Sequence, residues 1–198
     1  MHPIETESYA ILRSRVDLTH LPPWTRAVVE RMVHASADLS FATTTTADED
    51  ALAGAADALR TGTPLVTDVA MVAAGIRRDL VGAVVCRVAD PAAARIAAEA
   101  GLTRSAAAVR LAAEQVGPGA VWVVGCAPTA LAEIVILRPR PLLVIGLPVG
   151  FVGAAEAKAA LRASRLPQLS NVGEKGGSAV AAAAANALLL PDHDEGTP

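Results

Sequence analysis

Short apolar runs that alternate with helix-forming segments constrain the fold of this chain more than any other feature. Four of these runs lie at residues 65–67, 83–88, 121–124 and 142–145, and a weaker one follows at 169–172. Continuous runs of this length are typical of strands that are buried on both faces of a parallel sheet. The pattern therefore predicts an α/β fold, a three-layer domain with a mostly parallel sheet of about five strands flanked by helices.

The segments between the runs carry helix signals. Proline or acidic residues open several of them and glycine ends others, which is the usual punctuation of helices. The segment before the first strand is predicted to be entirely helical. The expected helices span residues 7–13, 23–36, 48–60, 69–74, 91–100, 103–116, 128–137, 154–163 and 178–189.

Residues 1–190 are predicted to form a single domain, because no linker, repeat or second composition regime interrupts them. The acidic stretch at 191–198 is expected to be a disordered tail. The most apolar run, 179–190, is well short of the roughly 20 residues that span a bilayer. We expect it to be a buried helix, and we expect no membrane partner.

Composition excludes several function classes. The net charge is −3 and no basic stripe is present, so nucleic acid is not an expected partner. Cys86 and Cys126 form neither a disulfide framework nor a metal-ligand spacing, so no metal site is expected. The sequence shows no signal-peptide pattern, and a cytoplasmic location is the expectation.

Three glycine-rich loops follow predicted strands and lead directly into helices, at residues 125–130, 146–153 and 173–178. In an open parallel sheet, ligands bind outside the carboxyl ends of the strands, and helix N–H groups favour anions. Together the loops predict a broad site for a ligand with several carboxylates or phosphates. For any single loop, ordinary turn chemistry is the alternative. Dinucleotide, P-loop and nucleophile-elbow signatures are absent, so no nucleotide cofactor is expected.

His34 lies in the last turn of the predicted helix 23–36. The helix end and Glu30, four residues earlier, favour an imidazolium, whereas burial opposes it. Such a histidine can act as a general acid or base near neutral pH. The alternative is a helix-end histidine whose only role is to satisfy hydrogen bonds. Arg31 shares the helix edge and could hold a carboxylate beside His34.

Two further charged residues are candidates for ligand contact. Arg104 lies in the first turn of a predicted helix, where a cation opposes the helix dipole. This placement suggests a ligand role, with a solvated surface arginine as the alternative. Asp68 follows the first predicted strand, where a helix N-cap is the favoured role.

Several segments of the sequence, which follow one another in the same order as in the family, resemble the precorrin-8X methylmutase family of cobalamin biosynthesis. The likeness covers nearly the whole chain. The matching segments are Arg31-Met32-Val33-His34-Ala35, Thr67-Asp68, residues 71–75, Thr103-Arg104-Ser105-Ala106, Ala127-Pro128-Thr129-Ala130-Leu131, residues 148–156 and Gly176-Gly177-Ser178-Ala179. Cys126 stands where the family usually has asparagine, and Ala157 where it usually has serine.

The resemblance implies a 1,5-sigmatropic shift of a methyl group from C-11 to C-12 of the corrinoid ring, which converts precorrin-8X to hydrogenobyrinic acid. It implies that His34 transfers the proton, that Ser8 and Arg31 contact the substrate, and that Arg13 and Arg104 are further pocket arginines. It also implies a homodimer with pockets at the subunit interface. An intramolecular methyl migration needs no redox cofactor, nucleotide or protein-bound metal.

The expected partner is thus a tetrapyrrole, a corrinoid polycarboxylate. The expected substrate-binding residues are drawn from the resemblance and from the loops. They are Ser8, Arg13, Arg31, Thr67, Asp68, Arg104, Cys126, Thr129, Gly150, Gly176, Gly177 and Ser178.

Three alternatives remain open at this point. The substrate could be cobalt-precorrin-8, since a metal held by the macrocycle needs no protein ligand. A non-catalytic corrinoid carrier with the same pocket is the second alternative, and Cys126 is the residue that favours it. The third, a nucleotide-dependent α/β transferase, rests on fold analogy alone.

Overall fold

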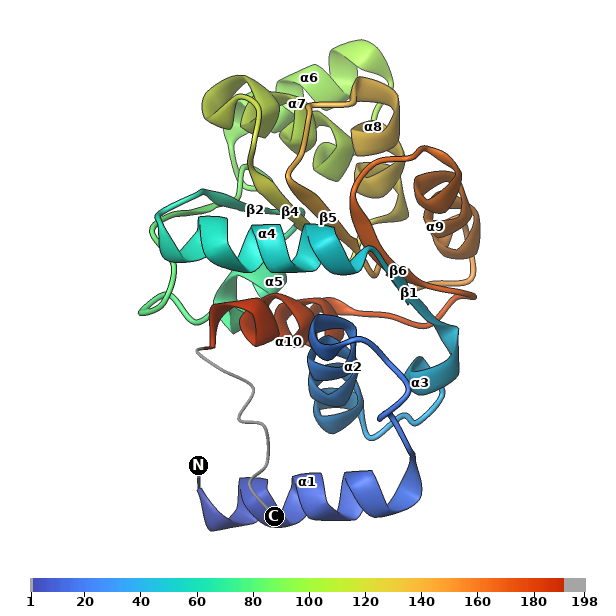
Figure 1. Ribbon diagram of the computed structural model, residues 1–198. Coiled ribbons are helices and arrows are strands. Elements are labelled where there is room, and N and C mark those ends of the chain that lie inside the picture. Colours follow the sequence, from blue (N-terminus) through green and yellow to red (C-terminus); the bar gives the residue numbers. More distant parts are fainter. Residues whose placement is uncertain (1, 191–198) are drawn as a thin grey trace.

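The computed structural model describes residues 2–190 and confirms the predicted α/β class (Figure 1). Within these residues one sheet contains six strands, and its order is β1-β6-β5-β4-β2-β3. Only β1 is antiparallel, and it pairs with β6 at one edge. The strands are β1 Thr45–Ala47, β2 Leu65–Thr67, β3 Val84–Val85, β4 Val121–Val124, β5 Leu143–Gly146 and β6 Gln168–Asn171.

Helices occupy every predicted helical segment. They are α1 Pro3–Arg15, α2 Pro23–Ser36, α3 Phe41–Thr44, α4 Glu49–Arg60, α5 Ala70–Gly75, α6 Pro91–Ala100, α7 Arg104–Val116, α8 Pro128–Leu137, α9 Ala154–Ala163 and α10 Ser178–Leu189. No helix within residues 2–190 is long and apolar enough to cross a membrane. The predicted acidic tail lies outside the described residues.

Alternating residues of each strand face two separate cores, as the period of two in a strand requires. Val121, Val123 and Leu143 pack into one core with helices α2, α4, α5 and α10. Trp122 and Val144 pack into the other core with α7, α8 and α9. The two helical layers with the sheet between them confirm the three-layer prediction (Figure 1). The alanine-rich helix α10 is buried, also as predicted.

The N-terminal helices extend the layer on the α10 side. Helix α2 packs closely on α10, whereas α1 packs on α2 and lies farther from the sheet, at the bottom of Figure 1. Helix α1 begins earlier than predicted, because Pro3 occupies its first turn and His2 Nδ1 accepts a hydrogen bond from the Ile4 N–H at 3.3 Å.

Two predicted details were wrong. The segment before residue 65 was expected to be entirely helical, but Thr45–Ala47 forms the edge strand β1 directly after α3. The expected strand 83–88 is reduced to Val84–Val85, because it lies at the far edge and only those two residues pair with β2. The sheet therefore has six strands in the described residues rather than about five.

The carboxyl ends of the parallel strands β2, β4, β5 and β6 lie at one edge of the sheet, together with the first residues of α10. Gly125 follows β4 and packs directly against that helix. A Cβ atom at Gly125 would lie 2.9 Å from the Cα of Ser178 and 2.7 Å from a methyl group of Val72. The absence of a side chain at Gly125 therefore allows the β4 loop to contact the start of α10.

Candidate active site

His34 and Ser8, both expected in the site, are brought together by the packing of α1 on α2. The Oγ of Ser8 lies 2.9 Å from Nδ1 of His34, which occupies the last turn of α2. Within residues 2–190, Nε2 of His34 has no hydrogen-bond partner. The serine therefore fixes the orientation of the ring and leaves its other nitrogen free to exchange a proton.

Tyr9, the residue after Ser8, also contacts His34, and it was not predicted from the sequence. Its ring stacks on the His34 ring, with centroids 4.8 Å apart and planes 9° from parallel. The guanidinium carbons of Arg13 and Arg31 lie 5.7 and 5.5 Å from the Tyr9 ring centroid. The available signal was that Tyr9, the chain's only tyrosine, is on the same predicted helix as Ser8.

The hydroxyl of Tyr9 is buried without a hydrogen-bond partner among the described residues. Burial raises the pKa of Tyr9 to about 12, and Arg31 opposes this shift in part. A phenol with a raised pKa favours folding below the unfolded-state value near 10, and this contribution is lost as the pH rises toward 12.

Replacing Tyr9 with phenylalanine is therefore expected to maintain or raise stability near neutral pH, because an unsatisfied buried hydroxyl is removed. Between pH 9 and pH 11 the wild-type protein should lose about 1 kcal/mol of stability relative to Tyr9→Phe. Urea unfolding of both proteins at the two pH values measures this difference. An equal pH dependence in the two proteins would show that the phenol is not shielded from water.

Both arginines beside Tyr9 are paired with carboxylates of the protein itself. Arg31 donates to Glu5 at 3.0 Å, and Arg13 binds Glu30 through two hydrogen bonds of 2.9 and 3.0 Å. Glu30, which was expected to favour an imidazolium at His34, is thus bound by Arg13. Each guanidinium keeps further N–H donors that a substrate carboxylate could bind, although its charge is already offset by a carboxylate of the protein.

Asp68 does not cap a helix, which corrects the favoured role. The N-cap of α5 is Val69, while the Asp68 carboxylate accepts the backbone N–H groups of three consecutive residues after β4. The distances are 3.1 Å from Gly125, 2.9 Å from Cys126 and 2.8 Å from Ala127. Burial raises the pKa of Asp68, and these three donors oppose the shift. This loop therefore directs its N–H groups at Asp68 rather than at a ligand.

Three other expected residues lie near this loop. Thr67 is buried in β2, and its hydroxyl has no partner among the described residues. Cys126 is an exposed residue. The pKa of its thiol is raised, mainly because the sulfur is partly shielded from water and secondly because Asp68 is negatively charged. Thr129, in the first turn of α8, lies 2.7 Å from the hydroxyl of Thr103, oxygen to oxygen.

Arg104 follows Thr103 and is exposed at the start of α7. Thr103 and Thr129 line a hollow of about 260 Å³ that extends from the start of α7 along one side of α8. Within residues 2–190, Arg104 has no ion-pair partner, so its charge is available to a ligand at this edge.

The remaining expected residues belong to two loops that hold each other. The N–H of Gly150 donates to the carbonyl of Glu174 at 3.1 Å, and that of Gly177 to the carbonyl of Leu147 at 2.9 Å. Gly176 packs against the carbonyl of Leu147 so closely that no side chain would fit. Ser178 begins α10 and is 9% exposed. These glycines serve contact between the loops, and their N–H groups are only partly available to a ligand.

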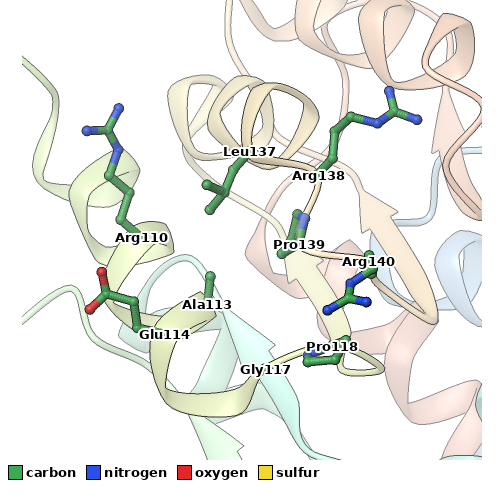
Figure 2. Close-up of a pocket in the computed structure, with 9 residues that line it drawn as sticks. All are labelled: Arg110, Ala113, Glu114, Gly117, Pro118, Leu137, Arg138, Pro139 and Arg140. Atoms are coloured by element: carbon green, nitrogen blue, oxygen red, sulfur yellow. The ribbon is translucent and has the colours of Figure 1, made fainter.

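A larger cavity, of about 530 Å³, lies elsewhere (Figure 2). It opens between the last turns of α7 and α8 and the segment 138–140, at the amino ends of β4 and β5. None of the expected site residues lines it. The described residues contain no group of three or more His, Cys, Asp or Glu side chains that could hold a metal ion.

The family model described as precorrin-8X methylmutase matches residues 3–190. The chain belongs to the precorrin-8X methylmutase family. Cobalt-precorrin-8 methylmutase of Methanothermobacter thermautotrophicus is 40% identical over 97% of this chain and 94% of its own length. Precorrin-8X methylmutase of a Sinorhizobium species is 40% identical over 95% of this chain and 93% of its own.

The solved structure of precorrin-8X methyl mutase from Thermus thermophilus matches with a TM-score of 0.84 and 34% identity, over 94% of this chain and 93% of that one. The resemblance inferred from the sequence is thus confirmed, as are the fold and an isomerase activity. In this methylmutase His34 lies on α2, beside α1, and not on one of the glycine-rich loops.

Proposed function

We propose that this methylmutase acts on precorrin-8X and moves a methyl group from C-11 to C-12 of the macrocycle, which gives hydrogenobyrinic acid for cobalamin biosynthesis. The observation that carries the proposal, in a member of this family, is that Ser8 contacts Nδ1 of His34 while Nε2 has no partner among the described residues. The bond from the methyl carbon to C-11 breaks as the bond to C-12 forms, so the step is an isomerisation without net oxidation.

In this proposal His34 acts as an imidazolium and protonates the macrocycle, which makes the receiving carbon electron-poor. After the methyl group has moved, the neutral imidazole takes a proton back from the macrocycle, so the product is an isomer of the substrate and His34 is regenerated. Ser8 and Tyr9 hold the ring in place, since one binds Nδ1 and the other stacks on its face. The substrate's peripheral carboxylates bind Arg104 and the remaining N–H donors of Arg31 and Arg13. The first turns of α8 and α10 supply further polar contacts at the same edge.

We also propose a cytoplasmic homodimer in which two copies complete the pocket. Exposed apolar side chains lie on two segments near the site and fit such an interface. Phe151 and Val152 are 97% and 88% exposed on the loop after β5, and Ile4 is 71% exposed on α1.

Visible absorption during anaerobic incubation with precorrin-8X tests the function. Conversion to the hydrogenobyrinic acid spectrum by catalytic amounts of protein is the expected result. A bound tetrapyrrole whose spectrum stays unchanged would contradict the enzyme and favour a corrinoid carrier. Cobalt-precorrin-8 is the second candidate substrate, because relatives with that name are 40% and 38% identical to this chain. Parallel incubation with the cobalt form separates the two.

A further inference from the structure

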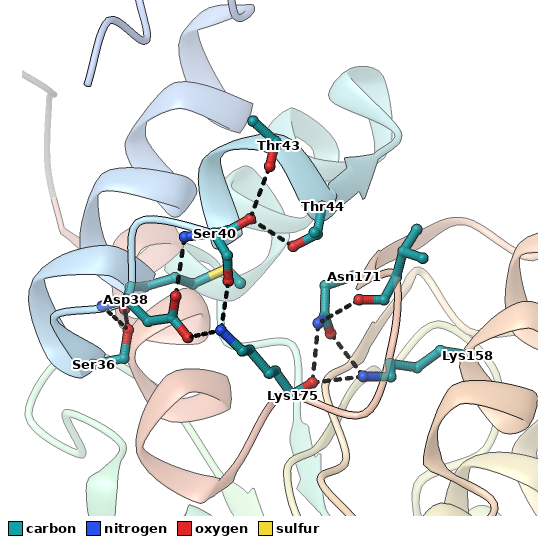
Figure 3. A network of polar contacts seen from close by, with 10 residues as sticks. Ser36, Asp38, Ser40, Thr43, Thr44, Lys158, Asn171 and Lys175 are labelled. Carbon is teal, nitrogen blue, oxygen red and sulfur yellow. Dashed lines mark hydrogen bonds and ion pairs between the residues drawn. The ribbon is translucent and has the colours of Figure 1, made fainter. Parts of the chain in front are cut away.

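Lys158 of α9 is fully buried, yet no carboxylate within residues 2–190 contacts it (Figure 3). Its Nζ donates to Oδ1 of Asn171 at 3.0 Å and to the carbonyl of Lys175 at 2.6 Å. Burial lowers the pKa of Lys158 to about 8, and the neighbouring Arg162 lowers it further while Glu174 raises it. A buried ammonium with only neutral acceptors is costly, so its position calls for an explanation beyond packing.

The buried side chains of Lys158 and Asn171 both contact the carbonyl of Lys175. It accepts hydrogen bonds from Nζ of Lys158 and, at 2.9 Å, from Nδ2 of Asn171. Two donors on one carbonyl fix the direction of the chain immediately before Gly176 and Gly177. Lys158 and Asn171 therefore anchor the glycine-rich loop 173–177 from beneath.

The side chain of the same Lys175 reaches out to the helix that carries His34. Its Nζ lies 2.6 Å from Oδ2 of Asp38 and 3.0 Å from Oγ of Ser40, just beyond the end of α2. Figure 3 shows Lys175 between the buried cluster on one side and the α2 end on the other. Lys175 is thus held at two points. Its carbonyl binds Lys158 of α9, and its ammonium binds Asp38, four residues after His34.

We propose that Lys158 is a positioning residue of the methyl-transfer reaction, which acts through Lys175 to hold the loop 173–177 against the end of the helix that carries His34. The inference rests on the proposed function, in which the loop 173–177 and His34 contact the same substrate molecule from two sides. A misplacement of about 1 Å between a catalytic group and its substrate can cost two orders of magnitude in rate.

The exposed half of the connection gives the sharper test, because an exposed ion pair contributes little to folding stability. Lys175→Met removes the ammonium, and Asp38→Asn removes the negative charge that it binds at the surface. We expect both variants to lower kcat for precorrin-8X about tenfold while the dissociation constant of the bound tetrapyrrole changes less than threefold. Lys175→Arg keeps a cation beside Asp38 and should retain most of the wild-type kcat.

Lys158→Met tests the buried half, and the double variant Lys158→Met/Asp38→Asn tests the link. Because both changes break one connection, the double variant should lose no more kcat than Lys158→Met alone. Asp57→Asn, which breaks the exposed Arg60–Asp57 pair on α4, is the matched control and should behave as wild type.

Wild-type kcat in Asp38→Asn and Lys175→Met would overturn the proposal, whatever Lys158→Met does. A kcat loss that merely follows the fraction of folded protein would overturn it as well, since that is the behaviour of a purely structural lysine. If the wild-type protein does not convert the substrate, the proposed function fails and the inference fails with it. The wild-type arm therefore distinguishes the two failures.

Discussion

Replacement of His34 with alanine is expected to lower the kcat of the methylmutase about 10³-fold, within the range that a positioned general acid contributes. The histidine is the one ring in the described site with a nitrogen held by Ser8 and a second nitrogen unpartnered. The variant keeps the arginines and the loops, so the bound tetrapyrrole should give an unchanged spectrum. Anaerobic single-turnover conversion, followed by visible absorption, measures the effect.

Two matched variants separate proton transfer from orientation. His34→Gln keeps polar atoms near Ser8 but cannot supply the proton, and it should be as slow as His34→Ala. Ser8→Ala keeps the imidazole but leaves its Nδ1 without the 2.9 Å contact, so a loss of about tenfold is expected. Turnover by His34→Ala close to that of the wild-type protein would refute the assignment of His34.

The fold was largely predictable because its signals are local. Continuous apolar runs such as 121–124 mark strands buried on both faces, and caps such as Asp90 and Thr103 mark helix starts. The edge strand β1 has no such run, since Thr45 and Thr46 pair on one side only, and its pairing with β6 spans more than 120 residues. No local pattern encodes that contact.

The resemblance supplied candidate site residues, but the contacts among them were not predicted. Neither the contact of Ser8 with His34 nor the pairing of Arg13 with Glu30 was predicted, because both depend on how α1 crosses α2. A helix pattern places each side chain on a face of its own helix, but it does not say which face of another helix lies opposite. The role of Asp68 was misjudged for the same reason, because its donors lie 57 to 59 residues away.

Replacement of Asp68 with alanine is expected to lower the free energy of unfolding by about 3 kcal/mol. The change leaves the N–H groups of Gly125, Cys126 and Ala127 without their acceptor, at a loop packed against the start of α10. Asn at position 68 retains one acceptor oxygen and places an amide group opposite the remaining donors, so a smaller loss is expected. Urea unfolding gives both values, with the exposed change Asp57→Ala as the control.

The same variants distinguish an anchor of the loop from a ligand contact. A residue that binds only substrate would leave stability unchanged on replacement and would weaken tetrapyrrole binding. Replacement of an anchor instead lowers the free energy of unfolding. It affects catalysis only indirectly, through Thr129 and the first turn of α8, which follow the loop directly. Unfolding of Asp68→Ala at the wild-type urea midpoint, with weaker substrate binding, would therefore assign Asp68 to the ligand and contradict the structural role derived from its three hydrogen bonds.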